Sequence, residues 1–158
     1  MSSAPIITVV TDTDQTVANW DIGTIQSNND SSVLTILIWN NRGGATATSD
    51  LKDCSITSLD VDGGSSSDVV SGKWVNVNIQ SIDGNTTTWT QVGGSVVKAL
   101  RADGVTASDG NMIKGTTNDG NKTTSKVNYC TARLKLHVPL NAVSGARSWK
   151  MRINGYYV

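Results

Sequence analysis

Apolar and polar residues alternate along two stretches near the C-terminus. In residues 129–138 the apolar phase runs from Cys130 to Val138 at every second position, and residues 147–153 repeat it with Trp149, Met151 and Ile153. A period of two is typical of strands that turn one face to a core and the other outward. Between them, residues 139–145 begin with a proline and end with a glycine, which favours a chain reversal. The pattern therefore predicts a β-hairpin that closes the domain.

Further strands are predicted from the same patterns. Residues 33–39 are almost continuously apolar, which predicts a central strand covered on both faces. Residues 20–26 are expected to form an edge strand. The remaining predicted strands are 6–10, 52–59, 73–82, 86–92 and 96–100, separated by turn-forming clusters at 28–32, 60–67 and Asp83-Gly84.

This arrangement predicts an all-β fold. About eight to ten short strands at roughly ten-residue spacing indicate an antiparallel β-sandwich, immunoglobulin-like or jelly-roll. The length of 158 residues favours a single domain over 1–158. Residues 102–126 are rich in Gly, Asp and Thr and are expected to form a long loop, a kind of segment that is usually functional or disordered.

Charge is balanced overall but unevenly distributed along the chain. The 13 acidic residues are all Asp and end at Asp119, while residues 121–158 hold seven Lys or Arg and no acid. A net charge of zero gives no reason to expect nucleic acid as a partner. No apolar stretch is long enough for a transmembrane span, and Met1-Ser-Ser-Ala-Pro lacks the features of a signal peptide. We therefore expect neither a membrane partner nor secretion.

The residue types that carry catalysis are scarce. The chain has one histidine, no Glu and none of the common hydrolase, metalloprotease or phosphate-loop motifs. His137 is expected to be a surface residue of a strand. Paired aspartates such as Asp60 and Asp62 are better explained by turns than by a calcium loop. The sequence thus predicts no enzyme, no metal site and no cofactor.

Two cysteines lie in the apolar phase of their predicted strands. Cys54 and Cys130 are expected to be buried, reduced thiols, because free cysteine packs like a small hydrophobic residue. A disulfide remains an alternative if the two strands face each other, but it is not expected without secretion.

Trp74 lies in the polar phase of the predicted strand 73–82. The polar residues that share its phase are Asn76, Asn78 and Gln80. An indole flanked by amides can stack on a sugar ring and hydrogen-bond its hydroxyl groups. The competing interpretation is that Trp74 is covered by a loop or by a neighbouring subunit, since aromatic residues are enriched at interfaces.

The predicted C-terminal hairpin carries a cluster of basic residues. Its members are Arg133, Lys135, His137, Lys150 and Arg152. If the two strands paired directly, like charges would face each other, which is unfavourable. Something acidic is therefore expected over this face, from the Asp-rich first 120 residues of the same chain or of the next copy. The alternatives are a solvated face, a subunit interface and a site for an anionic ligand.

The pattern of the closing segment resembles the last two strands of immunoglobulin-like sandwich domains. It comprises Val138-Pro-Leu-Asn-Ala-x-x-Gly145 and then Trp149-Lys-Met-Arg-Ile-Asn-Gly-Tyr-Tyr157. In its short strands rich in Gly, Thr and Asn, the whole chain resembles small β-rich virion proteins of tailed phages and prophages of Gram-positive bacteria. Segments that carry this likeness are Ser49-Asp-Leu-Lys-Asp-Cys-Ser-Ile56 and Val70-Ser-Gly-Lys-Trp-Val75. The resemblance implies a structural role and no catalytic residues.

These observations lead to three functional expectations. The first is a non-enzymatic capsid or tail component, assembled in the host cytoplasm, that forms a homo-oligomer and docks onto other virion proteins. The second is a carbohydrate-binding module that contacts a bacterial surface glycan through Trp74 and the neighbouring amides. The third is a fragment of a secreted enzyme or adhesin.

Overall fold

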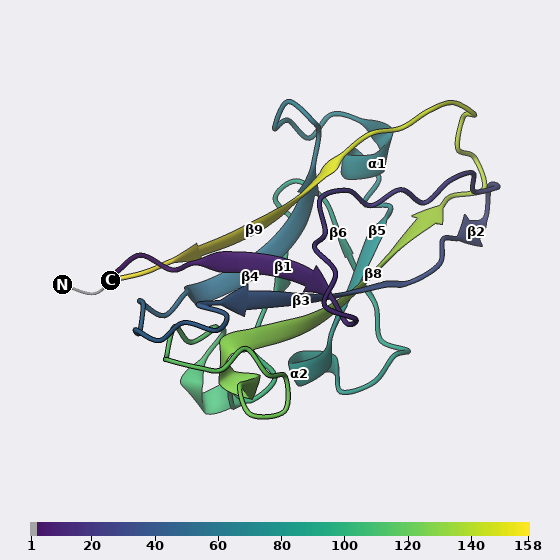
Figure 1. Cartoon of the computed structure of the whole chain (residues 1–158). Helices are drawn as coiled ribbons and strands as arrows, with labels where there is room; N and C mark the ends of the chain where they lie inside the picture. The colour runs from purple at the N-terminus through teal and green to yellow at the C-terminus, as the bar shows by residue number, and fades with distance from the viewer. Residues whose placement is uncertain (1–2) are drawn as a thin grey trace.

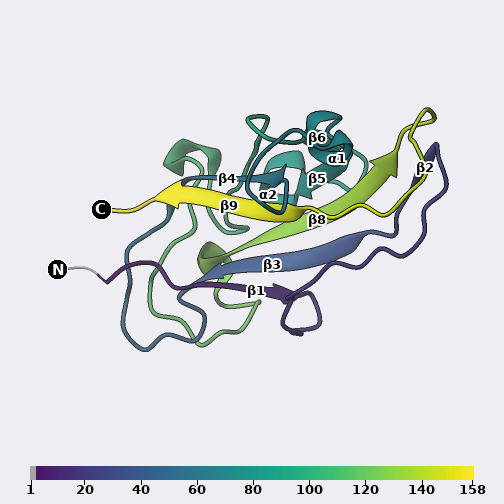
Figure 2. The same cartoon turned by 90° about the horizontal axis from the view of Figure 1, so that it is seen from above.

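A computed structural model describes residues 3–158 as two antiparallel sheets that pack as a sandwich (Figures 1 and 2). The larger sheet has the order β1-β3-β8-β5-β6, with β2 paired to β8, and the smaller one β7-β4-β9. The strands of the larger sheet are β1 (Ile7–Thr11), β2 (Asn29–Asp30), β3 (Leu34–Asn40), β5 (Val75–Ile79), β6 (Thr90–Val92) and β8 (Tyr129–Val138). Those of the smaller sheet are β4 (Lys52–Leu59), β7 (Lys98–Ala99) and β9 (Lys150–Tyr156). The predicted all-β antiparallel fold is confirmed.

Strand β3 is buried on both faces, as its apolar run predicts. It lies between β1 and β8, and Ile36 and Ile38 point into the main core between the sheets. On its opposite face, Trp39 and Leu37 pack in a second cluster with Tyr129, whose ring centroid lies 4.6 Å from that of Trp39. Burying both faces removes more apolar surface from water than a one-sided strand can, so β3 is a major contributor to stability.

The predicted C-terminal hairpin is wrong, although its two strands exist. Strand β8 pairs with β3 and β5, whereas β9 pairs only with β4 in the other sheet. Residues 139–149 therefore cross from one sheet to the other instead of reversing the chain within one sheet. The alternation of β8 is as expected, with every second residue from Cys130 to Val138 buried. Trp149, Met151 and Ile153 also face the core.

Several other boundaries differ from the sequence prediction. Residues 20–26 form no strand, and within the described residues 3–158 no backbone–backbone hydrogen bond involves residues 18–27. We call residues 18–27 the strap, because Trp20, Ile22 and Ile25 pack onto the core from the open side of the sandwich. The short helix α1 (Asp68–Ser71) lies where no element was predicted, and α2 (Gln80–Asp83) replaces the end of the predicted strand 73–82. Strands β4 and β5 lie in different sheets, so residues 60–67 are not the loop of a β-hairpin between them.

The long segment 102–126 packs against the sandwich through buried side chains and backbone bonds. It contains the 3₁₀ helix η1 (Ala107–Asp109), and η2 (Lys126–Asn128) follows it. Ile113 is fully buried and exchanges two backbone hydrogen bonds with Leu51. The Asn40 amide donates to the carbonyls of Ser49 (2.9 Å) and Ile113 (3.1 Å). Buried amides thus satisfy the backbone groups that an irregular segment leaves unpaired.

Candidate functional site

The basic residues of β8 find their partners within the chain. Asp30 of β2 accepts from Lys135 Nζ at 2.6 Å and lies 2.7 Å from His137 Nδ1. The hydrogen bond from Lys135, together with that from His137, lowers the pKa of the Asp30 carboxyl. Arg133 instead donates to Asn78 Oδ1 (2.9 Å) and Gln80 Oε1 (2.6 Å). The acidic partner expected over this face is therefore Asp30 of the same chain.

Lys150 and Arg152 do not belong to that face. They lie on β9, in the other sheet, where both are exposed and neither makes an ion pair or side-chain hydrogen bond within residues 3–158. The predicted five-residue cationic surface is thus wrong: three members lie on β8 with partners, and two lie apart on β9.

The structure separates Trp74 from the amides predicted to share its face. Trp74 is 7% exposed, belongs to the main core and points between the sheets. Lys73, with φ of 53°, and the preceding helix α1 break the alternation, so Trp74 and Val75 both face inward. Asn78 is fully buried and donates to the carbonyls of Asn85 and Thr88. The four residues therefore form no common surface.

A different tryptophan borders the outer face of the larger sheet. Lys135 Nζ lies 4.7 Å from the ring centroid of Trp89, and beside it is a shallow polar depression of 600 Å³. The depression is lined by Asn28, Asn29, Asp30, Asn76, Gln91, Lys135 and His137. Sequence reasoning missed Trp89, although its phase in residues 86–92 is opposite to that of the buried Val92.

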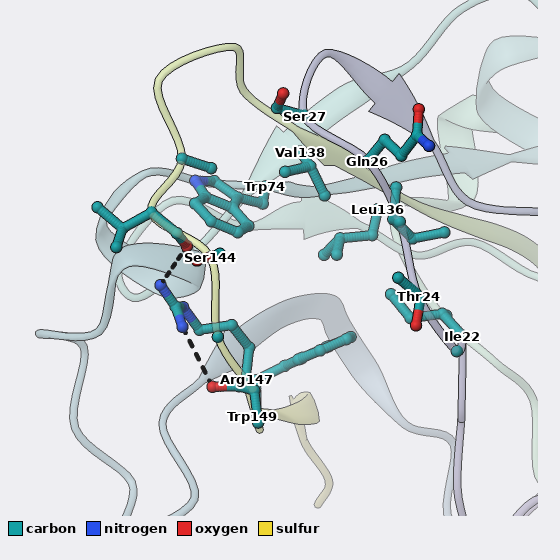
Figure 3. Close-up of a pocket in the computed structure, with 16 residues that line it drawn as sticks. Ile22, Thr24, Gln26, Ser27, Trp74, Leu136, Val138, Ser144, Arg147 and Trp149 are labelled. Atoms are coloured by element: carbon teal, nitrogen blue, oxygen red, sulfur yellow. Dashed lines mark hydrogen bonds between the residues drawn. The ribbon is translucent and has the colours of Figure 1, made fainter.

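A cavity lies at the end of the sandwich where β5 begins and β8 ends (Figure 3). It has a volume of 840 Å³ and we call it the end cavity. Trp74, Leu136 and Val138 form its wall on the sheet side, and the strap and residues 142–149 form the rest. A neighbouring cavity of 690 Å³ lies between the inner faces of the sheets, and Trp149 and Arg147 line both. Trp20 packs edge-on against Trp149, with ring centroids 5.7 Å apart.

Arg147 fixes the connection between the two sheets at this cavity. Its Nε donates to both carboxylate oxygens of Asp68 at 2.8 Å, and its Nη2 donates to the Val143 carbonyl at 2.9 Å. A further bond joins Nη1 to the Ala146 carbonyl at 3.2 Å (Figure 3). The bonds from Arg147 also lower the pKa of Asp68. Every nitrogen of the guanidinium is therefore already bound to the protein.

The two thiols are buried and free. Cys54 and Cys130 both belong to the main core, and burial raises the pKa of Cys54 to about 12 and that of Cys130 further. Thiols with such pKa values are almost entirely protonated at neutral pH and make poor nucleophiles. The prediction of buried, reduced cysteines agrees with these positions.

No known protein family, curated protein or solved structure matches the chain. Among residues 3–158 no helix is long and apolar enough to cross a membrane, and no group of three or more His, Cys, Asp or Glu side chains could hold a metal ion.

Proposed function

We propose that the chain is a non-enzymatic structural component of a phage particle, a capsid or tail protein that self-associates through the free edge of β9 and docks onto other virion proteins. The resemblance of the sequence to small β-rich virion proteins suggests that the chain belongs to a phage particle. The observation that carries the self-association is the unpaired edge of β9, the longest free edge among the described strands. The side chains that could take part in catalysis contribute to the fold instead: His137 binds Asp30, and the two thiols are buried.

The β9 edge is built to accept another strand. β9 spans seven residues and pairs only with β4. The described backbone hydrogen bonds outside the strand ladders include none from residues 150–156. The edge of β1, by contrast, is partly covered, because Val17 donates to the Val9 carbonyl and Thr16 bridges to Val10. An exposed strand edge is a template for pairing with a second chain.

Charge selects one register for pairing β9 with β9 of a second copy. In an antiparallel pair centred on Ile153, Arg152 faces the partner's Asn154 and Lys150 faces the partner's Tyr156. A pair centred on Arg152 would place two arginines opposite each other, which is unfavourable. The Ile153-centred register also uses the whole strand and keeps Met151 and Ile153 on the core side. Such a two-fold interface is self-complementary, as closed homodimers require.

Exposed apolar residues extend this surface beyond the end of β9. Tyr156, Tyr157 and Val158 are 51%, 53% and 84% exposed. The N-terminal segment lies beside them, because Ser49 bonds to both ends of the chain: its backbone N–H donates to the Ser3 carbonyl and its Oγ donates to the Val158 carbonyl. Ile6, 57% exposed, follows in that segment. Burying such residues against a second copy would add hydrophobic free energy to the backbone bonds.

Substitutions of Asn154 test this interface. Asn154→Lys places a cation opposite the partner's Arg152 twice in the dimer, at about 0.5–1 kcal/mol for each pair, and is expected to weaken dimerisation about tenfold. Asn154→Asp is expected to strengthen it by a similar factor. Sedimentation equilibrium over a concentration series measures both dissociation constants.

Matched controls are Asn141→Lys and Asn141→Asp, which make the same charge changes on the exposed connection between the sheets. These controls are expected to leave the dissociation constant within about twofold of the unsubstituted protein. A monomer at every concentration for all five proteins would contradict the proposal. Equal dissociation constants for the two Asn154 variants would also contradict it.

A further inference from the structure

The end cavity combines an aromatic wall with polar groups that have no partner. Trp74 is only 7% exposed, and its indole Nε1 makes no hydrogen bond to another described residue. The side chains of Thr24, Gln26, Ser27 and Ser144 also line the cavity and make no hydrogen bond within residues 3–158. The backbone of the strap adds further N–H and C=O groups to the same rim: none of them pairs with another backbone group of the described chain, although the Gly23 N–H donates to Asp21 and the Ser27 carbonyl accepts from Asn29. The cavity therefore presents donors and acceptors around an apolar wall (Figure 3).

No free charge is available to a ligand in this cavity. Arg147 is the only ionisable side chain in the lining, and Asp68 together with two backbone carbonyls occupies its guanidinium. An anion would have to displace Asp68, and a cation would find no carboxylate in the lining. The unpartnered rim equally disfavours a purely apolar ligand, because burying those groups against hydrocarbon would leave them unsatisfied.

The other aromatic surface is less suited to stacking. On the outer face of the larger sheet, Lys135 Nζ lies over the Trp89 ring, and the same ammonium is held by Asp30. A sugar would have to displace this cation from the ring. Trp149 in the end cavity has no cation over its ring among the described residues and is only partly buried.

We propose that the end cavity binds a neutral saccharide. The apolar faces of sugar rings pack against Trp149, Leu136 and Val138, and the hydroxyl groups bond to the indole N–H of Trp74 and to the polar rim. A volume of 840 Å³ lies within the range usual for small-ligand sites. This function goes beyond self-association, and the lining of the cavity includes no residue of β9, whose edge the proposed dimer uses.

The test follows the indole N–H signals of the five tryptophans by two-dimensional NMR during saccharide titrations. The probes are the methyl glycosides of glucose, galactose, mannose, rhamnose and N-acetylglucosamine, with N-acetylneuraminic acid as the anionic comparison. At least one neutral probe is expected to shift the Trp74 and Trp149 signals saturably. The signal of Trp39, buried in the second core cluster, serves as the internal reference.

Rim variants that should not disturb folding check the assignment. The double variant Thr24→Ala and Gln26→Ala removes two exposed polar side chains. It is expected to weaken binding about fivefold or more, because a fivefold loss corresponds roughly to the net contribution of one hydrogen bond. Asn141→Ala, which lies outside the cavity lining, is the matched control and should bind as the unsubstituted protein does. A saturable shift of Trp89 alone, tighter binding of the anionic sugar, or no saturable shift with any neutral probe would each overturn the proposal.

Discussion

Replacing Asn40 with leucine is expected to lower the free energy of unfolding by about 3–5 kcal/mol. Asn40 is fully buried at the end of β3, and its amide donates to the carbonyls of Ser49 and Ile113. Its Oδ1 also accepts from the N–H of Ile6 at 3.2 Å. Leucine has a similar size but can form none of these bonds. The Ile113 carbonyl keeps its bond from the Leu51 N–H, whereas the Ile6 N–H and the Ser49 carbonyl lose the Asn40 amide, and each buried group left unsatisfied costs about 1–3 kcal/mol.

Urea unfolding followed by circular dichroism measures the loss, as a shift of the midpoint at constant slope. Asn141→Leu is the matched control, because Asn141 is exposed and its side chain makes no hydrogen bond within the described chain. It should change the free energy of unfolding by about 0.5 kcal/mol or less. A loss below about 1 kcal/mol for Asn40→Leu would mean that the buried amide does not hold the long segment 102–126 in place.

The second large effect is expected for Gly93→Ala. A Cβ atom at Gly93 would lie 2.1 Å from the Val70 carbonyl oxygen and 3.1 Å from Lys73 Cγ. The oxygen belongs to the end of α1 and cannot rotate away, so the contact must be relieved by moving α1 or β6. Overpacking of this kind costs about 1–3 kcal/mol, and a backbone clash falls at the upper end.

The same movement would be felt at Trp74. Trp74 N–H donates to the Val69 carbonyl at 2.9 Å, which ties this residue to α1. Gly93→Ala is therefore expected to alter tryptophan fluorescence as well as to lower the unfolding midpoint. Ser95→Ala, an exposed position in the same turn, supplies the control. Unchanged stability in the Gly93 variant would show that α1 is not packed against this turn as described.

The sequence predicted individual strands better than it predicted their neighbours. The periods of β8 and β4 and the apolar run of β3 gave nearly correct bounds, because each reflects a face that must be buried. The pairing of β8 with β9 was wrong because a period of two tells which face is buried and not which strand lies alongside. The length of the connection, residues 139–149, already argued against a hairpin, because it exceeds that of the loops that usually join hairpin strands.

The prediction of site residues failed for the same reason, because it used only the pattern of neighbouring residues in the sequence. Trp74 was placed on the polar face by extending the alternation of β5 backward, but the positive φ of Lys73 and the helix α1 interrupt it. The strap resembles a strand in its pattern, yet its ends are fixed at β1 and β8, through Val17 and Asn28, and it packs by side chains alone. The acid expected over the basic residues of β8 was correct in kind, and the structure identifies it as Asp30.

Hydrogen–deuterium exchange at two protein concentrations, one below and one above the dimer dissociation constant, reports directly on pairing through β9. If β9 pairs with β9 of a second copy, amides within residues 150–156 should become more protected at the higher concentration, while those of the buried β3 should not change. Protection that does not depend on concentration in β9, or that appears at another edge such as β1, would contradict assembly through this strand.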